Sequence, residues 1–78
     1  MVDQRMAELV TRTILIDGKR TELRLESAFW DALMRIADDQ RTSVIALIEG
    51  IEADRKALGL ASAVRLFVLD YYRPRKQR

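Results

Sequence analysis

The stretch TILIDGKRTELRLESAFW, residues 13–30, decides the fold of this chain. Residues 13–16 are β-formers, Asp17-Gly18 is a favoured two-residue hairpin turn, and residues 20–26 alternate polar and less polar side chains. The stretch therefore predicts a β-hairpin whose turn fixes the register of its two strands.

The expected hairpin has one apolar and one polar face. With Asp17-Gly18 as the turn, the facing pairs are Leu15 with Arg20, Ile14 with Thr21, and Thr13 with Glu22. Because side chains alternate across a strand, we expect one face to carry Ile14, Ile16, Thr21, Leu23 and Leu25. The opposite face is then expected to carry Thr13, Leu15, Arg20, Glu22 and Arg24.

Apolar residues at helical spacing follow the hairpin directly. Phe29, Leu33, Ile36 and Ala37 predict a helix over residues 27–40, with Ser27 as its N-cap. The same spacing predicts that the Phe29-Trp30 pair packs in the core and does not stack on nucleobases.

Two further helices are expected after a break at residues 40–42. Ser43 is a credible N-cap for the second helix, and Gly59 is expected to end it in the left-handed conformation. The third helix, over residues 61–72, has apolar residues on two sides, which predicts contacts with two neighbours. Pro74 stops it.

Size and composition indicate one small domain that needs additional stabilisation. The chain has 78 residues, 49% of them hydrophobic and 33% charged, with no Cys and no His. A domain this short buries little surface, and neither a disulfide nor a zinc site is available to stabilise it. We therefore expect an obligate homodimer.

We expect the chain to have three parts that differ in charge and in whether they are folded. We expect a flexible N-terminal arm over residues 1–10, a folded domain over residues 11–72 and a basic tail over residues 73–78. The tail holds four of the 14 basic residues, so residues 1–72 carry ten basic and twelve acidic side chains. The net charge of +2 therefore comes from the tail and not from the domain.

The strand and helix order also favours a dimer. A two-stranded ribbon is at best marginally stable, so a monomer is expected to expose Leu23 and Leu25. Strands of two copies that pair about a two-fold axis would bury them. The expected dimer core consists of Leu23, Leu25, Trp30, Leu33, Leu47, Ile48 and Ile51.

Residues 12–72 resemble the small bacterial ribbon-helix-helix (MetJ/Arc-like) domain family, whose members are mostly recognised as DNA-binding proteins. The family pattern T-S-V-R-L-E-x-x-F-W-x-x-L is carried here by Thr21, Arg24-Leu25-Glu26, Phe29-Trp30 and Leu33. The fold class implied is mainly α with a short β-ribbon: a ribbon-helix-helix dimer with an N-terminal hairpin strand and an extra C-terminal helix. The chain departs from the family at Lys19 (often His), Glu22 (usually small and polar), Arg41 (commonly Gly) and Ala61 (Ser).

The outward stripe of the ribbon provides the expected base contacts, Arg20, Glu22 and Arg24. Arginine pairs bidentately with guanine, and a glutamate accepts a hydrogen bond from cytosine N4. The alternative is a solvated strand face in which Arg24 pairs with Glu22 or Glu26. Glu22 also weakens the DNA interpretation, because a carboxylate repels phosphate.

Phosphate contacts are expected at the start of the second predicted helix. Every helix N-terminus presents free N–H groups and a positive dipole end, and the resemblance points to this one. The expected phosphate contacts are Lys19, Arg41, Thr42, Ser43 and Val44; the alternative for Ser43 is a cap alone.

The resemblance implies a homodimeric transcriptional regulator, with repressor as the expected role and double-stranded DNA as the partner. The alternatives are a dimeric protein-interaction module that has lost DNA binding, with an unidentified protein partner, and an antitoxin. No catalytic residue, metal site or cofactor is expected, because no His or Cys is present and the three glycines are isolated. No membrane span or signal peptide is expected, so the predicted location is the cytoplasm.

Overall fold

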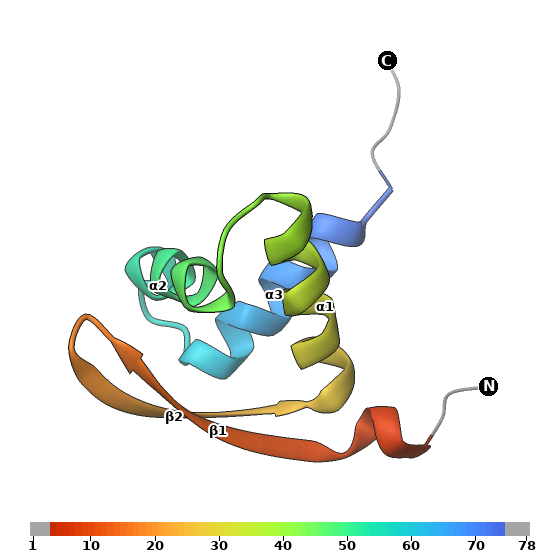
Figure 1. Cartoon of the computed structure of the whole chain (residues 1–78), viewed down its shortest axis with the longest axis horizontal. Coiled ribbons are helices and arrows are strands. Elements are labelled where there is room, and N and C mark those ends of the chain that lie inside the picture. The colour runs from red at the N-terminus through yellow and green to blue at the C-terminus, as the bar shows by residue number, and fades with distance from the viewer. Residues whose placement is uncertain (1–3, 75–78) are drawn as a thin grey trace.

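A computed structural model describes residues 4–74 of the chain. Its elements, in order, are a short 3-10 helix η1 (Gln4–Ala7), strands β1 (Leu9–Ile16) and β2 (Lys19–Glu26), and helices α1 (Ser27–Asp39), α2 (Val44–Asp54) and α3 (Leu60–Tyr72). The two strands form an antiparallel ribbon, and the three helices lie together on one side of it (Figure 1). The predicted ribbon followed by three helices is confirmed.

The hairpin has the predicted register. Leu15 lies opposite Arg20, Ile14 opposite Thr21 and Thr13 opposite Glu22. Asp17 and Gly18 have φ values of 52° and 79°, the two positive angles that a type I′ turn requires. β1 begins at Leu9, two residues before the expected start of the folded domain at residue 11.

The apolar face of the ribbon is covered by helices of the same chain. Leu23 and Leu25 are 2% and 0% exposed, and Ile16 lies beside them in one core cluster with Leu33 and Val64. The expectation that a monomer exposes Leu23 and Leu25 is therefore wrong. Leu23 and Leu25 are buried in a single chain because α3 packs against β2 as well as against α1 and α2 and so closes the core.

The other residues of the expected dimer core show the same pattern. Trp30, Leu33, Ile48 and Ile51 are buried within the single chain, and Leu47 is half-buried. Burial of these side chains does not require a second copy. The predicted core packing of Trp30 is confirmed, and its indole Nε1 donates a 2.9 Å hydrogen bond to the Val10 carbonyl of β1.

The first helix does not begin at the predicted cap. Glu26 is the N-cap residue of α1, and Ser27 is the first helical residue. Ser27 instead extends the ribbon by one pair: its N–H donates to the Glu8 carbonyl at 2.8 Å, and its hydroxyl donates to the Arg5 carbonyl at 2.6 Å. Because the Ser27 hydroxyl makes this bond, it does not cap the N-terminus of α1.

The second helix ends earlier than the position of Gly59 predicts. α2 ends at Asp54, and Lys56, not Gly59, adopts the left-handed conformation with φ 56°. The Arg55 guanidinium bonds both the Glu52 carboxylate, at 2.8 Å, and the Leu58 carbonyl, at 2.7 Å, which stabilises the turn. Gly59 has φ −64° and is the N-cap residue of α3.

Candidate nucleic-acid interface

The outer face of the ribbon points away from the helices and carries the predicted polar stripe. Arg20, Glu22 and Arg24 alternate with buried or half-buried residues along β2, and all three are exposed. The alternation arises because Leu23 and Leu25 must face the helices, which turns each intervening side chain outward. The structure thus brings the three expected base-contact residues together in one row.

The two arginines of this row form no ion pair or side-chain hydrogen bond with any residue from 4 to 74. The carboxylate of Glu26, one of the two alternative partners of Arg24, is bonded instead to the Arg65 guanidinium of α3 at 2.8 Å. This hydrogen bond lowers the pKa of the Glu26 carboxyl below its ordinary value. Both guanidinium groups therefore keep their donors for a partner.

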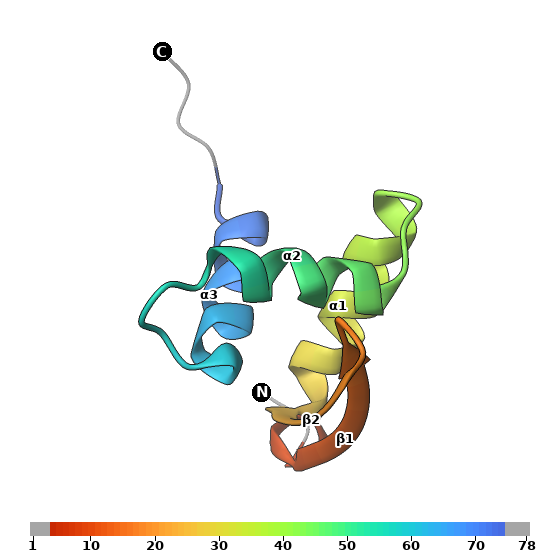
Figure 2. The ribbon, with the colours of Figure 1, turned by 90° about the vertical axis from the view of Figure 1, so that its left-hand side faces the viewer.

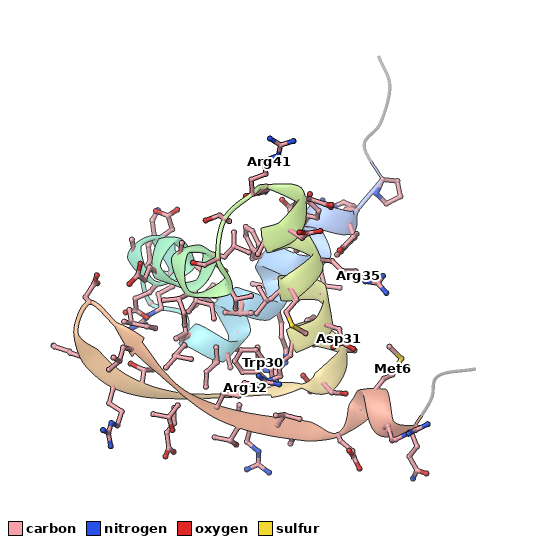
Figure 3. All side chains as sticks on the ribbon, viewed as in Figure 1. Met6, Arg12, Trp30, Asp31, Arg35 and Arg41 are labelled. Atoms are coloured by element: carbon pink, nitrogen blue, oxygen red, sulfur yellow. The ribbon has the colours of Figure 1, made fainter. Side chains whose placement is uncertain are left out.

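Arg12 lies on the helix-facing side of β1 and was missed by the sequence reasoning. Its guanidinium carbon is 5.1 Å from the centre of the Trp30 ring, a cation–π contact (Figure 3). Both residues line a largely apolar cavity of about 190 Å³ together with Ile14, Met34, Val44 and Ile45. Extending the strand alternation back from Ile14 would have found this position.

The start of α2 lies beside β1. Ser43 caps the helix as predicted, because its side chain accepts a 3.0 Å hydrogen bond from the Ala46 N–H. Val44 and Ile45 share the cavity with Arg12 and Ile14 of β1, and Figure 2 shows the first turn of α2 on the β1 side of the molecule. Ser43 and Val44 are therefore next to one edge of the ribbon.

The remaining residues expected to contact phosphate lie elsewhere. Arg41 is exposed in the α1–α2 loop and points away from the ribbon at the far side of the helices (Figure 3). Its φ of 55° accounts for the glycine that is common at this position, because glycine adopts positive φ without strain. Thr42 is exposed, and its N–H is bonded to the Ala37 carbonyl at 2.9 Å.

Lys19 is also separated from the outer stripe. It lines a cavity of about 340 Å³ between the hairpin turn and the end of α2, together with Glu52 and Arg55. The five expected phosphate contacts are thus not assembled into one surface, and their roles stay predictions.

The order of strand β2 and helices α1 and α2 is that of small ribbon-helix-helix domains, to which this chain adds strand β1 and helix α3. The sequence model of the ribbon-helix-helix domain family matches residues 9–72, and the chain belongs to this family. It is also similar to the solved structure of an uncharacterized protein from Bordetella pertussis Tohama I, with 32% sequence identity and a TM-score of 0.79.

That similarity covers 90% of this chain and 60% of the other, so the chain spans less than two thirds of the length of the Bordetella protein. Among curated proteins, no sequence matches this chain. Within residues 4–74, no helix combines the length and apolar character needed to cross a membrane. Domains of this family are typically DNA-binding regulators without an enzymatic role, and they generally dimerise.

Proposed function

We propose that this protein binds double-stranded DNA through the outer face of its ribbon and acts as a transcriptional repressor. One observation carries the proposal: Arg20 and Arg24 stand exposed and without ion-pair partners among residues 4–74, on the outer face of a ribbon whose inner face is packed against helices. A rigid platform that presents two unpaired guanidinium groups suits a ligand rich in acceptors. The major groove, which admits a two-stranded ribbon, is such a ligand.

In this proposal each side chain of the row has a defined role. Arg20 and Arg24 donate bidentately to O6 and N7 of guanines, and Glu22 accepts from the N4 amino group of a cytosine. The N–H groups at the start of α2, at Ser43 and Val44, contact the phosphates that flank the β1 edge. Arg41 is not part of this surface, because it points away from the ribbon.

The active form proposed is a homodimer, as is general in the family. Because Leu23 and Leu25 are covered within one chain, the contacts between copies come from other surfaces. Apolar side chains remain exposed on α3, where Leu66 and Leu69 are both more than half exposed. These residues also favour the alternative function, a protein-interaction module, in which Glu22 prevents DNA binding.

A binding experiment separates the two functions. Fluorescence anisotropy with fragments of the flanking genomic DNA is measured for the wild type, Arg24→Ala and the charge-matched control Arg35→Ala, which alters an exposed arginine on α1. We expect Arg24→Ala to weaken specific binding by about 1–3 kcal/mol per contact and Arg35→Ala to leave it nearly unchanged. Equal losses for both variants, or no binding by the wild type at low salt, would contradict the proposal.

A further inference from the structure

The two aromatic residues in the first turn of α1 each contact an arginine from another element. The Arg65 guanidinium carbon of α3 is 5.9 Å from the centre of the Phe29 ring. The Arg12 guanidinium carbon of β1 is 5.1 Å from the centre of the Trp30 ring. Arg65 is also bonded to the Glu26 carboxylate at 2.8 Å, so its charge is balanced within the chain. The first contact is therefore a complete structural ion pair.

The second contact has no carboxylate. The Arg12 side chain forms no ion pair and no hydrogen bond with any residue from 4 to 74. A cation–π contact holds the charge in place without an acceptor for the N–H donors, whose planar fork matches the oxygens of a phosphate. Arg12 therefore presents a positive charge and free donors to an anion from outside the described chain.

The indole of Trp30 is a fixed platform for this arginine. It is 4% exposed, and its Nε1 donates a 2.9 Å hydrogen bond to the carbonyl of Val10, which lies on the same strand as Arg12. A side chain that is already positioned loses less conformational freedom on binding than an unconstrained one does. The exposed Arg35 of α1 has no such platform and points away from Trp30 (Figure 3).

The position of Arg12 indicates which part of a duplex it would meet. Arg12 lies opposite Leu23, on the helix-facing side of the ribbon. The expected base contacts, Arg20 and Arg24, are on the outer face. Arg12 also shares a cavity of about 190 Å³ with Val44 at the start of α2. With the outer face in a groove, Arg12 is therefore beside the sugar-phosphate strand at the β1 edge and not at the base edges.

We infer that Arg12, positioned by Trp30, binds a DNA phosphate beside the β1 edge and does not read the sequence. This inference rests on the proposed function. The phosphate accepts charge-assisted hydrogen bonds from Arg12 as the Glu26 carboxylate does from Arg65. Phosphate contacts fix the orientation of a protein on the duplex, whereas base contacts supply its sequence preference.

Arg12→Met tests the charge without removing the packing, because methionine keeps an apolar stem over the indole. Fluorescence anisotropy is measured at several salt concentrations with a preferred duplex selected from random DNA and with a duplex of scrambled sequence. We expect Arg12→Met to weaken binding to both duplexes equally, by about tenfold, and to lower the slope of log affinity against log salt by about 1 for each chain bound.

Two further variants complete this experiment. The matched control Arg35→Met is expected to bind both duplexes as the wild type does. Arg12→Lys keeps the charge and is expected to keep the wild-type salt slope. Circular dichroism verifies that each variant is folded before its affinity is compared.

The emission of Trp30 provides a second readout, because it is the only tryptophan of the chain. We expect saturating duplex to change this emission in the wild type and to change it much less in Arg12→Met. Poly-glutamate at the same charge concentration should have little effect. An equal response to poly-glutamate would overturn the assignment to DNA phosphate and indicate an acidic protein partner instead.

The outcome of the binding experiment separates this inference from the proposed function. If Arg24→Ala weakens binding while Arg12→Met leaves both affinity and salt slope unchanged, this inference alone fails. A loss confined to the preferred duplex would also overturn it, because Arg12 would then contact bases. No binding by the wild type at low salt would overturn the proposed function as well.

Discussion

The same substitution at two glycines is expected to change stability in opposite directions. Gly18 has φ 79° in the hairpin turn, and Gly50 lies inside α2. Apart from adjacent residues and the backbone of α2 itself, no heavy atom lies within 4 Å of a Cβ atom built at either position, so neither substitution causes a clash with another part of the chain. The difference between the two variants therefore isolates the backbone conformation.

The magnitudes follow from that conformation. Gly18→Ala forces a residue with a Cβ into the left-handed region, which costs about 1–2 kcal/mol. Gly50→Ala replaces a glycine in a helix interior, which stabilises by about 0.5–1 kcal/mol. A domain of this size changes its melting temperature by about 4–8 °C per kcal/mol, so the two variants should differ by roughly 6–24 °C.

Thermal unfolding followed by circular dichroism at one fixed chain concentration measures this difference. The wild type should melt between the two variants. If Gly18→Ala melts at or above the wild-type temperature, the type I′ turn is not the native turn and the register derived from it fails. If Gly50→Ala is destabilised as well, α2 approaches another surface at that position.

Three other predictions concern the core, a helix cap and pH. Leu25→Ala, at a fully buried position, should lower the free energy of unfolding by about 2–5 kcal/mol, whereas Leu58→Ala, at an exposed position in the α2–α3 loop, should change it by less than about 0.5 kcal/mol. Urea denaturation followed by the fluorescence of the single tryptophan measures both, and equal effects would contradict the ribbon packing. Ser43→Ala should destabilise by about 1 kcal/mol in the same assay because the Ala46 N–H loses its acceptor, and an unchanged midpoint would mean that solvent replaces the cap. The Glu26 pKa is lowered from 4.5 in the folded state, so the stabilising contribution of this carboxylate is present above pH 4.5 and is lost as the pH falls through the folded pKa. Glu26→Gln should therefore lose less stability on acidification than the wild type does. Parallel curves of stability against pH would show that the Glu26–Arg65 pair does not cause the acid sensitivity.

The ribbon was predictable because one local signal determines it. A two-residue turn at Asp17-Gly18 fixes which residues face each other, and alternation then fixes which side chains point outward. The exposure of Arg20, Glu22 and Arg24 follows from that turn and from the need to bury Leu23 and Leu25. These parts of the fold depend on residues that are neighbours in sequence.

The remaining features depend on long-range contacts. Apolar periodicity shows that Leu23 and Leu25 are buried, but it does not show whether α3 of the same chain or a second chain covers them. Ser27 does not cap its helix because its hydroxyl and its N–H donate to the carbonyls of Arg5 and Glu8, which lie far earlier in the chain. Arg41 lies far from the ribbon because the path of the α1–α2 loop, and not the spacing of residues, sets its direction.

The central claim is that the outer face of the ribbon is the DNA-binding surface, and backbone amide chemical shifts during a DNA titration test it most directly. Uniformly ¹⁵N-labelled protein is titrated with a genomic DNA fragment that it binds, and the changes in amide chemical shift are mapped residue by residue. We predict the largest changes at the ribbon positions Thr13, Arg20, Glu22 and Arg24 and small changes at Leu66 and Leu69 of α3. Changes concentrated on α3, with the ribbon amides unmoved, would contradict the claim.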